Sequence, residues 1–409
     1  MELLYERCAG LDVHKRSVTA CVWLSTGRST THQTRTFSTM TDDLLALGDW
    51  LASLGVQQVA MESTGVYWRP VYQLLEERFA LWLVNAQHVK AVPGRKTDAN
   101  DAQWLGDLLR HGLVRRSFVP PLPQRELREL TRHRTSLVGK RTQAANELQK
   151  VLEGTNLKLA SVVSHVTGVS ARAILDALLA GQGDPAVLAE LAQGRLRRKR
   201  AELQRALQGT LRSHHRLLVA QLLAELDFLE EQITEVSAEI AQRLLPQQAT
   251  LARLDDIPGV NQRIGEIVLA EVGEDMSRFP SAPHLIAWAG VCPGNDQSGG
   301  RQRSSRVRPG NRALKTALVE AAHAAAHTKG SYLRVLYQRL ARRRGPGRAL
   351  IAVARSILTA IYHMLKRGTG WQDLGPLYFE QRDPARLAAR LRRRLEKLGF
   401  QVTLSAAPV

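Results

Sequence analysis

The chain has 409 residues, of which 44% are hydrophobic, and its 57 Lys and Arg against 38 Asp and Glu leave a formal net charge of +19. This length requires two or three domains with sizeable cores. A positive charge of this size favours a polyanionic partner, of which nucleic acid is the commonest, although a generally basic soluble protein is the alternative on charge alone. The three cysteines show no CxxC and no paired spacing, which argues against a disulfide framework and against a zinc site.

The ends and the apolar stretches of the chain show no membrane pattern. The N-terminus lacks a basic segment followed by an apolar one, so we expect no signal peptide. The most apolar late stretch, Ala349 to Leu365, is interrupted by Arg355 and His363. We therefore expect a cytoplasmic protein without a membrane contact, in which this stretch is a buried helix.

In the first part of the chain, strand and helix patterns alternate. The predicted strands are Cys8–His14, Val18–Leu24, Gln33–Ser38, Val56–Met61 and Ala80–Val84, and the predicted helices begin at Thr41, cover Val66–Phe79 and run from about Asp98 to His111. A meander of three strands followed by β-α alternation is the order of the ribonuclease-H-like fold. We therefore expect an α/β, ribonuclease-H-like domain over residues 1–119.

Beyond Gln124 the strand patterns stop and helical patterns take over. The segment Gln124–Glu153 is helical in pattern and rich in arginine. Further on, hydrophobic residues recur alternately three and four positions apart, as in a coiled coil. Such a seam can pack on a second copy or on the chain's own helices, with a slight preference for self-association as a dimer or tetramer. The seam consists of Val219, Leu222, Leu226, Leu229, Ile233, Val236 and Ile240.

The composition of these segments predicts three further regions after the first domain. We expect a helical and coiled-coil region over residues 120–250. A mainly α domain with a helix-hairpin-helix and a serine-glycine turn should follow over residues 251–343. Residues 344–409 should form a basic helical tail.

Four acidic residues occupy strand positions and one helix start of the first domain. Asp12 lies in the first strand and Glu62 ends the fourth, while Asp98 and Asp101 are three residues apart at a helix start and so share a face. Taken singly, Asp98 could be a helix cap and Asp101 an ordinary solvated residue. If the first and fourth strands are neighbours, the four carboxylates converge, and their mutual repulsion requires cations. We expect two Mg²⁺ ions, on the order of 4 Å apart, that act on a phosphodiester.

Cations and a glycine turn indicate where nucleic acid would bind. Arg95 and Lys96, beside the acidic residues, could hold phosphates. The sequence Ile257-Pro-Gly-Val-Asn261 between two helical stretches is typical of a helix-hairpin-helix, whose turn presents backbone N–H groups to a phosphate. Asn261 stands where a second glycine is usual and tolerates a left-handed conformation. We expect Gly259 and Asn261 to contact the DNA backbone, with an ordinary αα turn as the alternative.

A Ser-Gly-Gly sequence, residues 298–300, precedes a run of arginines. Gly299 and Gly300 would let the backbone approach a ligand closely, although such a sequence alone is usually just a flexible turn. Asn311 and Arg312 begin a helix and would form another anion site. The arginines that could clamp phosphates and stabilise a pentacoordinate transition state are Arg301, Arg303, Arg306 and Arg308.

The motifs GLDVHK, MESTG, KTDANDA, IPGV, WAGVCPG, QSGG and PGNRALK occur in this order over nearly the whole chain. The chain resembles the DEDD-type insertion-sequence transposases (the IS-one-ten and IS-eleven-eleven group) and the related Piv/MooV DNA invertases. The resemblance implies a Holliday-junction-resolvase-like first domain with the tetrad Asp12, Glu62, Asp98 and Asp101. It also implies a C-terminal transposase domain in which Ser298 attacks DNA and forms a phosphoserine link.

The resemblance further implies the partners. They are the element's DNA ends, the target DNA and a structured guide RNA, or bridge RNA, from the same element, with active sites assembled between subunits. Family members often carry a second serine beside the nucleophile, where this chain has Gln297. Ser304 and Ser305 are nearby alternatives that lack flanking glycines. No obvious general base lies near Ser298, so the metal site or the phosphate would accept the hydroxyl proton.

These residues predict an enzyme of DNA transposition that cuts and rejoins strands. A site-specific DNA invertase is one alternative. Another is a metal-dependent, junction-resolving nuclease that uses water and needs no serine. A third is a non-catalytic nucleic-acid-binding protein, for which the complete set of four acidic residues would have no purpose.

Overall fold

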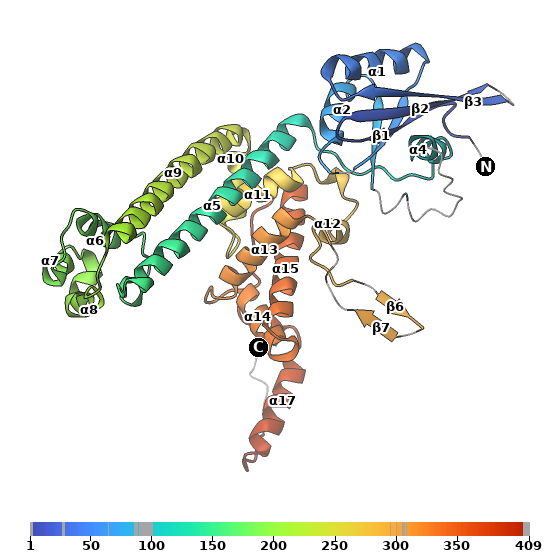
Figure 1. The fold of residues 1–409 in the computed structure, drawn as a ribbon. Coiled ribbons are helices and arrows are strands. Elements are labelled where there is room, and N and C mark those ends of the chain that lie inside the picture. Colours follow the sequence, from blue (N-terminus) through green and yellow to red (C-terminus); the bar gives the residue numbers. More distant parts are fainter. Residues whose placement is uncertain are drawn as a thin grey trace. The chain divides into compact units, whose positions relative to one another are not determined.

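The structure is a computed structural model that describes residues 3–26, 29–63, 65–85, 89, 101–294, 296–299, 301–304, 307 and 309–403 (Figure 1). For residues 296–298 and 301–304 it describes the backbone alone. The chain divides into two compact units, Met1–Pro121 and Leu122–Val409.

The first unit contains a five-stranded mixed sheet in the order β3-β2-β1-β4-β5. β1 pairs antiparallel with β2 and parallel with β4, so the predicted neighbourhood of the first and fourth strands is confirmed. All five predicted strands are present. β3 begins earlier than predicted because its exposed, polar start pairs along the whole length of β2. The strands are β1 (Arg7–Val13), β2 (Ser17–Thr26), β3 (Ser29–Ser38), β4 (Gln58–Glu62) and β5 (Ala80–Val84).

Helices cover both faces of this sheet (Figure 1). Helices α1 (Thr41–Ser53) and α2 (Trp68–Leu75) pack on the face that carries Leu11 and Met61. Helix α4 (Asp101–Arg110) packs on the other face, where Leu105 and Leu108 meet Cys8 and Ala60. α2 is shorter than predicted, since turns lead into it from Gly65 and out of it towards β5.

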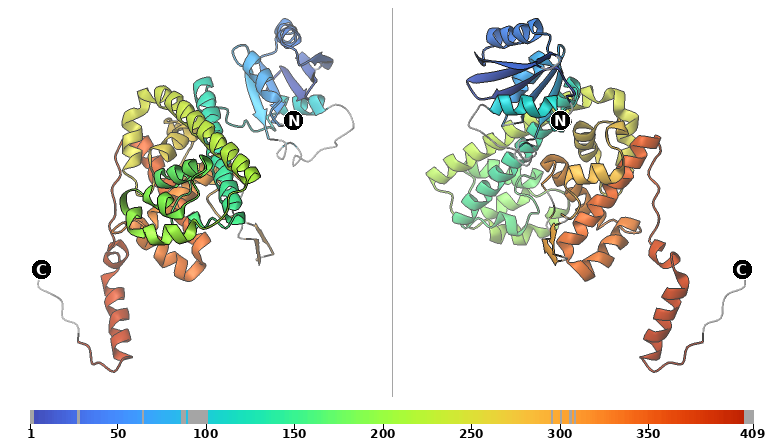
Figure 2. Two further views of the ribbon diagram at one scale, coloured as in Figure 1. Left: turned by 60° about the vertical axis from the view of Figure 1, so that its left-hand side comes forward. Right: turned by 90° about the vertical axis from the view of Figure 1, so that its right-hand side faces the viewer.

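The second unit begins with two long helices that lie side by side, α5 (Leu122–Gly154) and α9 (Ser213–Arg243) (Figures 1 and 2). Residues 155–212 connect their ends, and we call this segment the tip module. Apolar residues of α5, the tip module and α9 share one core. The elements of the tip module are η1 (Leu159–Ser161), α6 (Val169–Leu179), α7 (Pro185–Glu190), η2 (Gly194–Lys199) and α8 (Arg200–Ala206).

The coiled-coil seam of α9 is buried within the chain. Val219, Leu226, Leu229 and Ile233 lie in the core shared with α5 and the tip module, Ile240 lies in the next core, and Leu222 and Val236 are partly buried. The slight preference for self-association through this seam is therefore wrong. The physical reason is that α5 presents a matching apolar face, which includes Leu137, Leu148 and Leu152.

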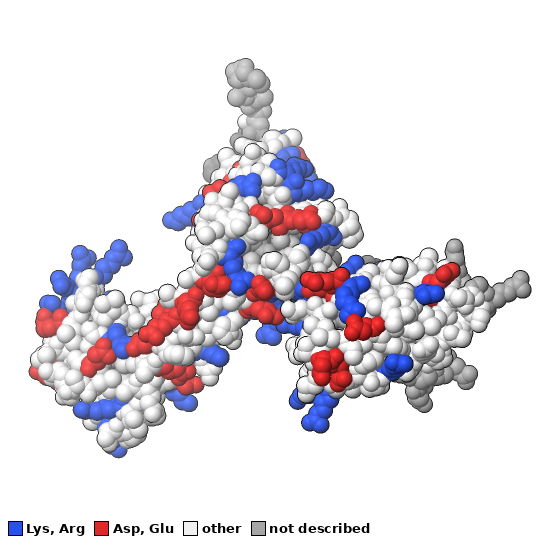
Figure 3. All heavy atoms as spheres, turned by 90° about the horizontal axis from the view of Figure 1, so that it is seen from above, with Lys and Arg blue, Asp and Glu red and all other residues white. Residues whose placement is uncertain are grey.

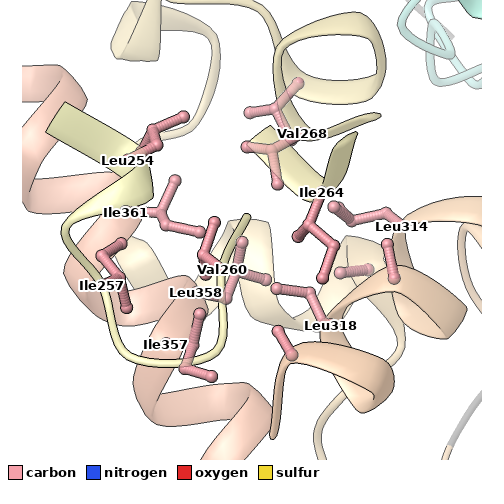
Figure 4. Close-up of a cluster of buried hydrophobic side chains, with 14 of the residues drawn as sticks. Leu254, Ile257, Val260, Ile264, Val268, Leu314, Leu318, Ile357, Leu358 and Ile361 are labelled. Carbon is pink, nitrogen blue, oxygen red and sulfur yellow. The ribbon is translucent and has the colours of Figure 1, made fainter. Parts of the chain in front are cut away.

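The rest of the second unit is a helical bundle with its own core (Figure 4). Helix α15 contributes Val353, Ile357 and Ile361 to that core, which confirms the buried helix predicted over residues 349–365. By length and composition alone, α15 is apolar enough to cross a membrane. The bundle comprises η3 (Leu245–Gln247), α10 (Gln248–Asp255), α11 (Gln262–Val272), η4 (Met276–Arg278), α12 (Ala282–Ala289), α13 (Arg312–Ala325), α14 (Tyr332–Arg344) and α15 (Pro346–Arg367).

Two features of this half differ from the sequence prediction. The core runs across the expected boundary at 343/344, because α14 and α15 both pack in it, so the basic helical tail begins after Arg367. It contains α16 (Tyr378–Gln381) and α17 (Pro384–Glu396), neither with a buried residue. The mainly α domain also contains a β-hairpin of β6 (Asp296–Ser298) and β7 (Arg301–Ser304), too short and polar to show a strand pattern.

Candidate active site

Helix α4 approaches β1 unusually closely at Gly10. A Cβ atom there would overlap the carbonyl oxygen of Ala102 and the backbone of Gly106. The two glycines thus allow strand and helix backbones to touch, as glycine does where a side chain would intervene. Trp23 of β2 holds the helix from the side, since its Nε1 donates to the Gln103 carbonyl oxygen at 3.1 Å.

The contacts along β1 show which end of α4 lies nearest Asp12. The N–H of Leu4, which precedes the strand, donates to the Arg110 carbonyl oxygen, the Cys8 thiol lies 3.6 Å from the Gly106 carbonyl oxygen, and Gly10 faces Ala102. Successive residues of the strand therefore meet successively earlier residues of the helix. Asp12 follows Gly10 by two positions and shares its face. The carboxylate of Asp12 thus points towards the N-terminal end of α4, where Asp101 stands.

Glu62 joins this face through the parallel pairing of β1 with β4. Leu11 of β1 is the register partner of Met61 of β4. Asp12 and Glu62 follow these two residues, on neighbouring strands that are about 4.8 Å apart. Ala60, two residues before Glu62, packs with Cys8 against α4. Asp12, Glu62 and Asp101 therefore belong to the same face of the sheet, which we call the acidic face.

The acidic face is not a completed metal site in the part of the chain that the structure describes. No group of three His, Cys, Asp or Glu side chains there could hold a metal ion. The fourth predicted member, Asp98, lies outside the described residues, as do Arg95 and Lys96. The structure thus places Asp12 and Glu62 on the face of the sheet that α4 covers and Asp101 at the start of α4.

The structure adds one neighbour that sequence patterns missed. His14 lies 3.0 Å from Asp12, between His14 Nε2 and Asp12 Oδ2, and its side chain is exposed. The two residues are two positions apart in the GLDVHK motif, so the i, i+2 spacing on one strand was the available signal. Cys8 lies earlier on the same strand. Burial raises the pKa of its thiol to about 12, so Cys8 is an uncharged part of the core.

Ser298 is the last residue of β6, directly before the hairpin turn. Gly299 in that turn has a φ of +56°, a left-handed conformation that glycine adopts without strain, and no described atom lies within 4 Å of where its Cβ would stand. Ser298 pairs across the hairpin with Arg301. Arg303 lies in β7, as does the alternative nucleophile Ser304, whereas Gly300, Ser305, Arg306 and Arg308 lie outside the described residues.

Asn311 has a structural role in addition to the predicted one. Its side-chain oxygen caps α13 by accepting from the N–H of Leu314, and its Nδ2 donates to Glu271 at 2.6 Å. The helix that the sequence predicted here is confirmed, and Arg312 at its start is exposed. Both polar groups of the Asn311 side chain are thus engaged within the bundle.

The turn between α10 and α11 packs into the core rather than outwards. Ile257 and Val260 are buried (Figure 4), and a Cβ on Gly259 would overlap the backbone of α13. Gly259 has a φ of +86°, whereas Asn261 is extended, with a φ of −108°, and caps α11 through Ile264. The expected left-handed Asn261 is therefore wrong, because its side chain serves as a helix cap. Two helices joined by a tight turn fit both the helix-hairpin-helix and the ordinary αα turn, and DNA contact by Gly259 or Asn261 stays a prediction.

Two family models match the chain. One describes a DEDD-type transposase of IS110 and covers residues 9–157, and the other describes the transposase IS116/IS110/IS902 family and covers residues 251–338. The chain belongs to the IS110 family of transposases. The first match includes β1, β4 and α4, and the second includes the β6–β7 hairpin, so both candidate parts of the active site lie in matched regions.

Similar proteins agree with this membership. This IS110-family chain is 30% identical over 161 residues to "Insertion element IS110 uncharacterized 43.6 kDa protein" of Streptomyces coelicolor, covering 39% of each chain. It is 26% identical over 329 residues to "Probable family 20 transposase" of Pseudomonas aeruginosa, covering 78% of this chain and 87% of that one. It is 28% identical over 321 residues to "Insertion element IS900 uncharacterized 42 kDa protein" of Mycobacterium paratuberculosis, covering 70% of this chain and 79% of that one. Membership in a transposase family implies an enzyme that acts on DNA.

Proposed function

We propose that this transposase cuts and rejoins DNA strands with the acidic face of its first unit and with Ser298 of its second. The observation that supports the proposal is that Asp12 of β1 and Glu62 of β4 directly follow register partners on the face of the sheet that α4 covers, with Asp101 at the start of that helix. The sheet order β3-β2-β1-β4-β5, with the first three strands antiparallel and the last two parallel, supports a ribonuclease-H-like fold for this unit.

The donor set of the acidic face fits magnesium. Carboxylate oxygens are the ligands that this hard cation prefers, and three carboxylates on one face need positive charge beside them. Asp12, Glu62, Asp101 and Asp98 would hold two such ions. When bound, the ions supply a Lewis acid and charge neutralisation for a phosphodiester.

Ser298 is proposed as the nucleophile because of its place at the end of β6. Its Oγ attacks the phosphorus, the bond to the 3′ oxygen breaks, and the proton of the serine hydroxyl ends on the leaving 3′ oxygen, which becomes a free 3′-hydroxyl. The 5′ side of the cut is then a phosphoserine ester. A 3′-hydroxyl from the partner strand attacks that ester, joins the strands and returns the proton to Ser298. Arg301, its cross-strand neighbour, and Arg303 would bind the phosphate.

The partners are part of the same proposal. We propose element ends and target as the DNA, a structured RNA from the element as guide, and a dimer or tetramer in which one subunit supplies the acidic face and another the serine. Because the α9 seam is buried within the chain, the assembly must use another surface.

A covalent trapping assay tests this function. Labelled element-end or junction DNA is incubated with Mg²⁺, the element's upstream non-coding RNA and each protein variant, and adducts are separated on denaturing gels. Ser298→Ala and Asp12→Ala should each reduce the adduct by at least about 10³-fold. Ser304→Ala and Asp49→Asn, the latter an exposed carboxylate on α1, should leave it unchanged.

The other outcomes identify the alternatives. Cleavage without an adduct that survives Ser298→Ala would leave a metal-dependent nuclease. Loss of the adduct in Ser304→Ala but not in Ser298→Ala would move the nucleophile to Ser304. Tight, salt-sensitive binding without cleavage, unaffected by Asp12→Asn, would indicate a non-catalytic binding protein.

A further inference from the structure

The tip module contains a depression of about 640 Å³. The depression lies between the start of α6 and η2. A volume of this size is within the usual range for small-ligand sites, about 300–1,000 Å³. Neither family model covers the residues that line the depression, since the matches end at residue 157 and resume at residue 251.

The walls of the depression contain both apolar and positively charged side chains. Val162, Val163 and Leu196 form an aliphatic part, and Arg195 and Lys199 place cations at the same site. Ser164, His165 and Gln193 add polar groups. The hydroxyl of Ser170 accepts the N–H of Gln193 at 2.9 Å, which ties the start of α6 to η2 and fixes the two walls against each other.

The charge around the depression is unbalanced. The basic side chains come from the segment Arg195–Arg200. Within this segment, Arg200 pairs with Glu190 at 2.8 Å. Arg195, Arg197 and Arg198 are exposed and form no ion pair with any residue that the structure describes. In Figure 3, basic side chains gather at the tip, on the left, whereas a row of acidic side chains follows α9. Among the described residues, Arg195, Arg197 and Arg198 thus carry uncompensated charge, whereas Lys199 lies 3.9 Å from Glu202.

We propose that this depression binds an unpaired nucleotide of a single-stranded nucleic acid segment. The base lies against Val162, Val163 and Leu196, and the adjoining phosphates contact Arg195, Arg197 and Lys199. A paired base has its flat faces covered by neighbouring pairs, so a strand in a duplex cannot use the apolar wall. Single-strand sites combine apolar or stacking surfaces with cations that follow the backbone in the same manner. The inference rests on the proposed function only in that nucleic acid is the partner.

Replacing Val169 tests the site without weakening the fold. Val169 is the first residue of α6, is 72% exposed and lines the depression. A carboxylate there stabilises the helix N-terminus but repels a phosphate in the depression. Val187→Glu is the matched control, because Val187 is an exposed valine in the first turn of α7, outside the depression. We expect Val169→Glu to reduce crosslinking to the tip module by at least about tenfold and Val187→Glu to leave it nearly unchanged.

The probes are 12-nucleotide single strands that carry one photoreactive base, as RNA with 4-thiouridine and as DNA with 5-iododeoxyuridine. They are crosslinked to the full chain, and the attached peptides are identified by mass spectrometry. Crosslinks in residues 162–199 with one probe but not the other identify the strand as RNA or DNA. Equal crosslinks with both mean that the backbone and base, and not the sugar, are recognised. The same probes annealed into a duplex should not crosslink there.

Salt dependence gives a second measure. For single strands the slope of log K against log salt is about −0.7 per neutralised phosphate, so replacing Arg195, Arg197 and Lys199 by alanine should make the slope less steep by about 2. Replacing Arg342, Arg343 and Arg344, three exposed arginines at the end of α14, removes the same charge elsewhere and should change the slope less.

Three results would overturn the proposal: no crosslink in residues 162–199, an equal crosslink from the duplex, or equal effects of Val169→Glu and Val187→Glu. The DNA–protein adduct is measured separately. An adduct that survives Ser298→Ala while the crosslink in residues 162–199 is present would mean that the catalytic proposal alone fails. A Ser298-dependent adduct without that crosslink would mean that this proposal alone fails.

Discussion

At the scale of single residues, glycines decide the geometry of the acidic face. Gly10 and Gly106 permit β1 and α4 to touch, and this contact brings Asp101 to the side of the sheet that holds Asp12. The GLDVHK motif predicted a strand with an acidic residue in it. The motif gave no indication that Gly10, two positions before Asp12, is needed for α4 to pack on that face.

Gly10→Ala should lower the free energy of unfolding of the first unit by about 3 kcal/mol, because the added methyl group overlaps backbone that cannot move aside as a side chain can. Urea unfolding followed by fluorescence of Trp23 and its neighbours measures the change. Gly139→Ala is the control. Gly139 lies within α5 with nothing within 4 Å of its Cβ direction, so alanine there should stabilise the helix by about 0.5–1 kcal/mol. A loss of the same size in both variants would contradict the packing argument.

At the scale of elements, buried ion pairs fix α5 to α11. Arg134 and Glu266, both buried, lie 2.6 Å apart. Arg132 contacts both carboxylate oxygens of the fully buried Glu271, at 2.7 and 2.9 Å, and Asn311 donates to the same group. Burial lowers the pKa of Arg128, which also faces Glu271, to about 10. One carboxylate therefore joins α5, α11 and the start of α13, the helix that follows the serine hairpin.

Glu271→Gln should lower the free energy of unfolding of the second unit by about 3–5 kcal/mol, because it leaves the charge of Arg128 buried and uncompensated. Thermal and urea unfolding followed by circular dichroism measure the loss. The matched control is Glu230→Gln, which breaks an ion pair of 2.6 Å with Arg141 on the surface, where Glu230 is 56% exposed. Such a pair contributes at most about 1 kcal/mol. If Glu230→Gln cost as much as Glu271→Gln, burial would not be the cause.

At the scale of the whole molecule, the spacing of apolar residues on α9 is compatible both with a coiled coil between two chains and with packing on a helix of the same chain. The seam of α9 satisfies the spacing of a coiled coil, and the chain itself provides the partner helix. The prediction of a seam was right and the choice of partner was wrong, because spacing describes one surface and not the surface that meets it.

Leu226→Ala should therefore destabilise the second unit by about 2–5 kcal/mol through the cavity it leaves, without changing the oligomeric state at a concentration where the protein stays folded. Light scattering during size-exclusion chromatography gives the mass, and urea unfolding gives the stability. Phe228→Ala, on the same helix with 59% exposure, should change the stability by less than about 0.5 kcal/mol. Dissociation of an assembly by Leu226→Ala at full stability would show that the seam joins two chains.

The sequence by itself determined the local features of this protein. Alternating and helical periodicities placed the five strands of the first unit, the long helices and the buried α15, because side-chain patterning reports directly on which face of an element is buried. Its ordered motifs indicated the transposase family, and its acidic residues indicated a metal site, which stays a prediction.

Only the tertiary structure decided what those features contact. It paired β1 with β4 in the register that aligns Asp12 with Glu62, and gave the α9 seam an intrachain partner. It turned the glycine of the α10–α11 turn inward and placed Ser298 at a hairpin. These outcomes depend on pairing between segments far apart in the chain. Periodicity within one segment carries no information about the other, so a single sequence could not fix them.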